Sequence, residues 1–82
     1  MVTIDYSPSF QKTVGKLKDA ALKEKVKSQI RKVVENPEIG KPMRYARKGT
    51  REVYVKPFRL SYAYLKAEEK IVMLDLYHKD EQ

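Results

Sequence analysis

The sequence predicts an α+β protein in which two consecutive helices pack against an antiparallel sheet. Residues 51–78 contain three β-prone runs rich in Val, Tyr, Ile and Leu, with two short breaks between them. Two amphipathic helical patterns precede these runs, and a short alternating segment opens the chain. The expected order is a strand, a two-helix hairpin and a three- to four-stranded antiparallel sheet, written β-α-α-β-β-β.

The opening segment, residues 2–6, alternates apolar and polar side chains, which predicts a short strand. Ser7 and Pro8 then supply an N-cap residue and a proline at the first helical position. The next apolar residues recur at spacings of four and three and mark one buried stripe: Phe10, Val14 and Leu17. The pattern therefore predicts a helix over residues 8–17.

A second amphipathic pattern predicts a longer helix over residues 20–35, which Asn36 and Pro37 end. Its apolar stripe is Leu22, Val26, Ile30 and Val33. The opposite face is basic, and we interpret it as a solvated helix exterior: Lys23, Lys25, Lys27, Arg31 and Lys32. Because the connection between the helices is short, the two should form a helical hairpin.

The three β-prone runs predict strands joined by tight hairpins, over residues 52–56, 59–66 and 70–77. Tyr62 and Tyr64 share one face of the middle strand with Leu60, a spacing more typical of a core than of base stacking. We expect the helical hairpin to cover one face of the sheet and to leave the other face or the rim for function.

The segment before the strands is rich in turn-forming residues. Residues 36–42 contain two prolines and a glycine and should form a loop. Residues 43–48, which read MRYARK, should form a short strand or an extended segment. Gly49 and Thr50 then turn the chain into the sheet.

Length and composition narrow the classes of function. A chain of 82 residues is expected to be one domain, residues 1–82. The absence of Cys excludes disulfides and thiolate sites, and a single His predicts no metal site and no cofactor. No run approaches the roughly 20 apolar residues of a membrane span, and the first ten residues lack a signal-peptide pattern. We therefore expect a cytoplasmic protein with no membrane partner.

The charge balance indicates a polyanionic partner. Eighteen Lys and Arg residues against eleven Asp and Glu residues leave a net charge of +7, which attracts nucleic acid or an acidic protein. Solubility alone is the alternative explanation. Five basic residues around Tyr45 and the first β-prone run suit an RNA backbone with a stacked base: Arg44, Arg47, Lys48, Arg51 and Lys56.

Residues 36–80 resemble the RelE/ParE superfamily of toxins. The resemblance rests on four marks in order: GKP followed by a hydrophobic residue and Arg, KG before the strands, FRLSY at residues 58–62, and the closing HKD at residues 78–80. It implies a toxin of a type II toxin–antitoxin pair. In that superfamily the RelE branch cuts messenger RNA in the ribosomal A site, without a metal, by attack of the 2′-hydroxyl on the adjacent phosphate. The ParE branch inhibits DNA gyrase.

The resemblance also implies roles for individual residues. Arg59 matches the strand arginine that contacts the scissile phosphate, a role that suits a planar, permanently charged guanidinium. The alternative for Arg59 is a structural ion pair with a carboxylate such as Asp75 or Glu52. Lys79 matches a basic position after the last strand that helps protonate the leaving 5′-oxygen or holds phosphate. His78 beside it is a natural general acid or base, or an exposed histidine without a role.

The sequence departs from the RelE pattern at two places. Where the ribosome-dependent pattern has two lysines on the strand before the arginine, this chain offers Glu52 and Tyr54. A carboxylate can act as a base on the 2′-hydroxyl and a phenol can donate a hydrogen bond, while Lys56 can replace a missing cation. The C-terminal tyrosine of the pattern is absent, and Tyr77 is not equivalent to it.

The expected function is therefore that of a toxin which cleaves messenger RNA on the ribosome. The alternatives are a ParE-like inhibitor of DNA gyrase, and a basic RNA- or DNA-binding module without full cleavage activity. The expected partner is an acidic, helical antitoxin that lays a hydrophobic helix face into a groove and covers the basic patch with carboxylates.

Overall fold

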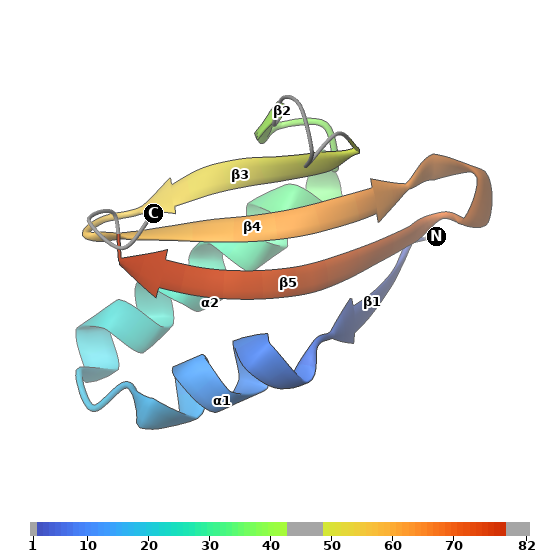
Figure 1. Ribbon diagram of the computed structural model, residues 1–82. Helices are drawn as coiled ribbons and strands as arrows, with labels where there is room; N and C mark the ends of the chain where they lie inside the picture. The colour runs from blue at the N-terminus through green and yellow to red at the C-terminus, as the bar shows by residue number, and fades with distance from the viewer. Residues whose placement is uncertain (1, 43–48, 79–82) are drawn as a thin grey trace.

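One layer of the structure is a sheet and the other is a pair of helices (Figure 1). The computed structural model describes residues 2–42 and 49–78. Within these ranges the helices are α1 (Pro8–Lys16) and α2 (Ala20–Glu35). The strands are β1 (Thr3–Tyr6), β2 (Lys41–Pro42), β3 (Thr50–Val55), β4 (Phe58–Leu65) and β5 (Lys70–His78). The predicted α+β class and β-α-α-β-β-β order are confirmed.

Both helices begin at side-chain caps, and the cap at Ser7 is predicted from the sequence. The Ser7 hydroxyl accepts a hydrogen bond from the Phe10 N–H at 3.0 Å, and Pro8 follows in the first turn. The Asp19 carboxylate accepts from the N–H groups of Ala21 and Leu22. These contacts satisfy backbone donors that a helix leaves without an internal partner.

The sheet has the order β1-β5-β4-β3-β2, in which β4 is central. Strands β2 to β5 pair antiparallel, as predicted for the meander, whereas β1 pairs parallel with β5. Lys70 Nζ lies 2.8 Å from the Asp5 carboxylate between these two strands. The sheet is therefore mixed: β2 follows the helices at the edge opposite β1, and the antiparallel strands then bring the chain back to β5 beside β1.

Two predictions about the segment before β3 have different outcomes. Lys41 and Pro42, expected in a loop, form the short strand β2 and pair with Glu52 and Arg51 of β3. That part of the loop prediction is wrong, because pairing with a later strand is a tertiary effect that turn-forming residues do not reveal. The predicted extended segment, residues 43–48, lies outside the described residues.

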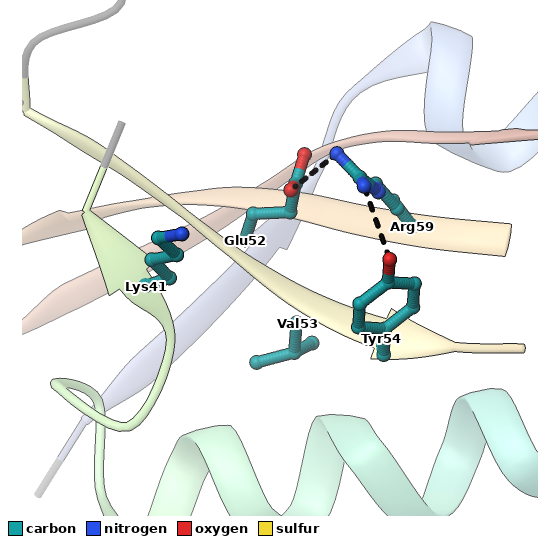
Figure 2. A pocket seen from close by; sticks show the side chains of 5 residues that line it. All are labelled: Lys41, Glu52, Val53, Tyr54 and Arg59. Carbon is teal, nitrogen blue, oxygen red and sulfur yellow. Dashed lines mark hydrogen bonds and ion pairs between the residues drawn. The ribbon is translucent and has the colours of Figure 1, made fainter. Parts of the chain in front are cut away.

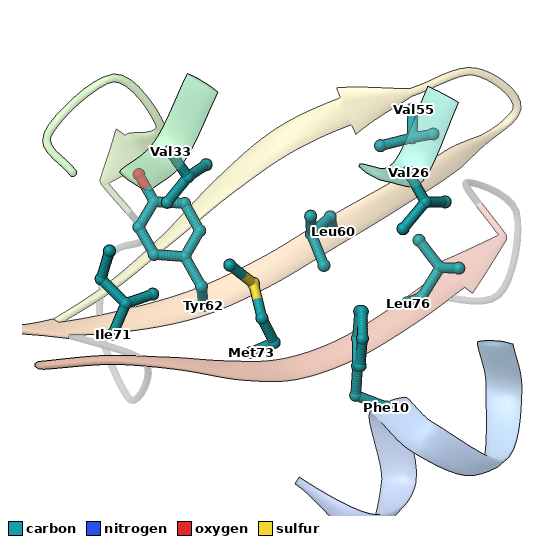
Figure 3. Close-up of a cluster of buried hydrophobic side chains, with 9 residues drawn as sticks. All are labelled: Phe10, Val26, Val33, Val55, Leu60, Tyr62, Ile71, Met73 and Leu76. Atoms are coloured by element: carbon teal, nitrogen blue, oxygen red, sulfur yellow. The ribbon is translucent and has the colours of Figure 1, made fainter. Parts of the chain in front are cut away.

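The core lies between the helices and one face of the sheet (Figure 3). Phe10 of α1 and Val26 and Val33 of α2 pack on buried side chains from the strands: Val55, Leu60, Tyr62, Ile71, Met73 and Leu76. Tyr62 is fully buried and Tyr64 packs against the same cluster, which confirms the core interpretation of these rings. The opposite sheet face, here called the open face, is left uncovered by the helices.

Tyr62 and Arg51 fix the loop between α2 and β2. The Tyr62 hydroxyl donates to the Pro37 carbonyl at 2.7 Å and accepts from the Gly40 N–H at 2.9 Å. Arg51 Nη1 donates to the carbonyls of Glu38 and Gly40, at 3.0 and 2.8 Å. Buried polar groups need such partners, so these contacts determine where β2 starts.

No helix in the part of the chain that the structure describes is long and apolar enough to cross a membrane.

The packing at Gly40 predicts opposite effects for two glycine substitutions. A Cβ on Gly40 would lie 2.7 Å from Tyr62 Oη and 3.0 Å from Arg51 Cβ, whereas nothing lies within 4 Å of a Cβ on Gly15 in α1. Gly40→Ala should therefore lower the free energy of unfolding by about 1–3 kcal/mol. The control Gly15→Ala should raise it by about 0.5–1 kcal/mol. Urea denaturation measures both, and an unchanged stability of Gly40→Ala would contradict the described packing.

Burial raises the pKa of Tyr62 above its ordinary value of 10.0. In the unfolded chain the phenol loses its proton near that value, while the folded protein still holds it. This contribution to stability is therefore complete below about pH 10 and is lost as the pH rises through the folded pKa. The free energy of unfolding should fall less steeply in alkali for Tyr62→Phe than for the parent. The exposed control Tyr6→Phe should follow the parent, and equal slopes for Tyr62→Phe and the parent would refute the prediction.

Candidate functional site

The open face of β3, β4 and β5 carries a row of three side chains that face one another. Tyr54, Arg59 and Tyr77 are register partners across these strands. Because side chains alternate between the two faces of a strand and Leu60 points into the core, Arg59 must project from the open face. Figure 2 shows Arg59 and Glu52 on the side of the sheet away from α2.

Arg59 is held by two neighbours on β3. Its Nη1 lies 3.2 Å from Glu52 Oε1, and its Nη2 donates to the Tyr54 hydroxyl at 3.0 Å (Figure 2). The guanidinium carbon lies 5.1 Å from the centroid of the Tyr54 ring, a cation–π distance. The side chains of Arg59 and Glu52 are 23% and 12% exposed, so this is a partly buried ion pair.

The same contacts keep the guanidinium charged and leave part of it for a ligand. The hydrogen bond with Tyr54, followed by the charge of Glu52, raises the pKa of Arg59 against the opposing effect of desolvation. Arg has five N–H donors. Two of them contact Glu52 and Tyr54, and Nε–H is buried with no hydrogen-bond partner among the described residues. Neither of the contacts with Glu52 and Tyr54 uses the other two terminal N–H groups, and the side chain of Arg59 is 23% exposed.

Glu52 connects Arg59 to a second aromatic residue, Tyr77. Tyr77 donates its hydroxyl hydrogen to Glu52 Oε2, while Glu52 Oε1 receives Arg59. In the sequence, Tyr77 does not align with the C-terminal tyrosine of the RelE pattern. Its contact with Glu52 is not predicted by the spacing of residues along the chain. It follows from the pairing of Arg59 with Tyr77 across β4 and β5.

A shallow pocket of about 190 Å³ opens beside this cluster. Its lining residues are Lys41, Glu52, Val53, Tyr54 and Arg59 (Figure 2). Lys41 is exposed and belongs to β2, whose pairing with β3 brings it beside Glu52. Lys41 is not among the residues that the sequence predicts to bind RNA. Its position at the site depends on the pairing of β2 with β3, which the sequence does not reveal.

Several predicted site residues lie away from this pocket. Arg51 points toward the helix side and donates to loop carbonyls. The His78 ring meets the Phe58 ring edge-on at 5.6 Å, and Phe58 packs against the core on that same side. Lys56 is exposed at the turn between β3 and β4. The other predicted basic residues lie outside the described residues: Arg44, Arg47, Lys48 and Lys79.

The structure thus brings together three of the predicted catalytic residues, Glu52, Tyr54 and Arg59. A guanidinium stabilises negative charge on a phosphate oxygen, a carboxylate accepts a proton, and a phenol can donate one. These groups line one pocket together with Lys41 of β2 (Figure 2). The arrangement is suited to binding a phosphate and moving protons beside it.

Several solved structures with the same fold are named as toxins or toxin–antitoxin complexes. Residues 4–82 match the family model described as the ParE toxin of the type II toxin–antitoxin system parDE. The chain is similar to the toxin structure in the intact E. coli RelBE toxin–antitoxin complex, with a TM-score of 0.81 and 16% identity over 95% of this chain and 96% of that one. No curated protein sequence matches the chain significantly.

Two further structures show the same likeness. The YoeB/ParE toxin from Agrobacterium tumefaciens gives a TM-score of 0.84 and 15% identity over 94% of this chain and 98% of that one. The RelBE2 toxin–antitoxin complex from Mycobacterium tuberculosis gives a TM-score of 0.80 and 23% identity over 95% of this chain and 98% of that one. The structural likeness shows the shared fold, and the family model covers nearly the whole chain. The chain therefore belongs to the ParE toxin family and is a type II toxin of the RelE/ParE superfamily.

Proposed function

We propose that this toxin cleaves messenger RNA on the ribosome by attack of a 2′-hydroxyl on the adjacent phosphate. The observation that carries the proposal is the cluster of Arg59, Glu52 and Tyr54 at one pocket on the open face. Similar folds occur in proteins named as RelE toxins. The RNA supplies its own nucleophile, and the proposal assigns the acid, base and charge-stabilising functions to side chains.

In the proposed reaction Glu52 takes the proton from the 2′-hydroxyl as the new bond to phosphorus forms. Arg59 stabilises the charge that develops on the phosphoryl oxygens, and such electrostatic stabilisation is usually the largest catalytic contribution. The bond to the 5′-oxygen breaks, and Tyr54 or Lys79 supplies the proton that this oxygen needs. The products are a 2′,3′-cyclic phosphate and a 5′-hydroxyl end.

The surroundings of the pocket support an RNA substrate. The chain carries a net charge of +7, and Lys41, which lines the pocket, is exposed. Arg44, Arg47 and Lys48 add positive charge to the segment that follows β2 in sequence. Such a field attracts the phosphate backbone independently of base sequence. The cytoplasm, which holds ribosomes and messages, is the compartment that this proposal requires.

Inhibition of DNA gyrase is the second candidate, and one observation favours it. Glu52 compensates the charge of Arg59 at 3.2 Å, whereas the RelE pattern has lysines on that strand. The family model is also named for the ParE toxin. A toxin of this kind would inhibit DNA supercoiling by gyrase and leave messages intact.

Either activity calls for an antitoxin, which we infer is acidic and helical. Solved proteins with the same fold include toxin–antitoxin complexes, and a strongly basic chain attracts an acidic partner. Expression of the chain alone should arrest growth, and co-expression with the neighbouring gene should relieve the arrest.

The proposed roles predict the behaviour of two variants in a translating extract. The parent should cut messages, and Arg59→Ala should cut them about 10²- to 10³-fold more slowly, because the developing charge loses its stabilising group. Glu52→Gln should also be strongly impaired. Primer extension on a reporter message measures the cuts, and binding to the antitoxin shows that each variant is folded.

The matched control is Arg31→Ala, which removes the same charge from the exposed face of α2. It should cut like the parent. Full activity of Arg59→Ala would contradict the catalytic role of Arg59. Intact messages together with inhibited supercoiling by gyrase would replace the nuclease with the second candidate.

A further inference from the structure

A second pocket opens on the same face, one step along the strands from Arg59. It has a volume of about 220 Å³ and is lined by Thr50, Ser61, Leu74 and Asp75. Ser61 follows Arg59 by two residues on β4, and side chains two residues apart share a face at a separation of about 7 Å. That separation is comparable to the length of one nucleotide. An RNA phosphate at Arg59 would therefore bring a neighbouring nucleotide to this pocket.

The carboxylate in the second pocket is held in a fixed position. The pairing of β4 with β5 shifts between Ser61 and Tyr62, so that Leu74 is the extra residue of a β-bulge. Bulges re-aim side chains and are common beside active sites. Asp75 Oδ1 accepts from the Leu76 N–H at 2.9 Å and from the Ser9 hydroxyl at 3.3 Å. Neither of these contacts uses Asp75 Oδ2.

The side chains that line this pocket suit a nucleobase and not a phosphate. A carboxylate repels phosphate but accepts hydrogen bonds from amino groups, as Asp and Glu do from the N4 amino group of cytosine. Ser61 and Thr50 contribute hydroxyls, and Leu74 contributes an apolar surface for the face of a base. Uracil presents one N–H between two carbonyl oxygens, and those oxygens would face a carboxylate unfavourably.

We propose that this pocket receives the base next to the phosphate bound at Arg59, and that Asp75 selects bases with an amino group over uracil. The inference rests on the proposed RNA cleavage, and it specifies the substrate of that site. Cytosine, adenine and guanine all carry the required amino group. Asp75 is a specificity-determining residue in this account and takes no part in the bond-breaking step.

The test compares the parent with Asp75→Asn in a translating extract, with cut sites mapped by sequencing RNA ends. For the parent, uracil should be depleted at one of the two positions that flank the cut. Asp75→Asn retains an oxygen for the contacts with Leu76 and Ser9, but it places an amide donor where the carboxylate accepts. The depletion of uracil should therefore fall by roughly fivefold or more. The control Glu24→Gln removes an equal charge from α2 and should keep the parent's preference.

A binding measurement separates this inference from the cleavage itself. Short RNAs with 2′-O-methyl groups cannot be cut, and fluorescence anisotropy compares those with cytosine against those with uracil. The parent should prefer cytosine and Asp75→Asn should lose that preference. If messages stay intact, the proposed nuclease activity is refuted, and the binding measurement alone tests whether Asp75 selects the base. Equal affinities in the parent, or an unchanged preference in Asp75→Asn, would overturn the role of Asp75.

Discussion

The ion pair between Arg59 and Glu52 is the interaction on which the site depends. Arg59 lies on β4, the central strand of the sheet, and its side chain is mostly buried. A buried charge needs a partner, and the carboxylate provides it while the Tyr54 hydroxyl fixes the other arm of the guanidinium. The same contact compensates one positive charge at the place where a phosphate would bind. The site is thus well oriented but less positive than a pair of lysines on the strand would make it. The positive charge of Lys41, which lines the same pocket, is therefore more important for attracting a phosphate.

The rest of the fold keeps this cluster in place. Both helices pack on one face of the sheet, and the opposite face is left for polar groups whose positions follow from strand register. On the helix side, Tyr62 and Arg51 bind the loop before β2, and β2 carries Lys41 to the pocket. Arg51 therefore supports the site from behind the sheet, although its charge and position in the sequence suggest contact with RNA.

The sequence predicts the local elements well, because each has its own periodicity and caps. The apolar stripe of α2 and the Ser7–Pro8 start of α1 indicate these helices from the sequence alone. Features that depend on pairing are beyond such patterns: the parallel alignment of β1, the strand β2 and the bulge at Leu74. The site residues likewise include some that local sequence signals identify and some that depend on tertiary structure. Arg59 is conspicuous in an apolar stretch, and both Glu52 and Asp75 are plausible partners from sequence. The strand register places both carboxylates opposite Ser61, and only the side-chain contacts show that Glu52 binds Arg59 while Asp75 lines the neighbouring pocket.

The salt dependence of RNA binding tests the central claim, which is that Arg59 contacts a phosphate although Glu52 already pairs with it. Each phosphate contact to a single strand contributes about 0.7 to the slope of log Kobs against log salt concentration. Affinities of the parent and Arg59→Gln for one uncleavable single-stranded RNA, measured over a range of salt concentrations, give the two slopes. The account predicts a slope that is shallower by about 0.7 for Arg59→Gln. Identical slopes would mean that the guanidinium serves only the ion pair within the sheet.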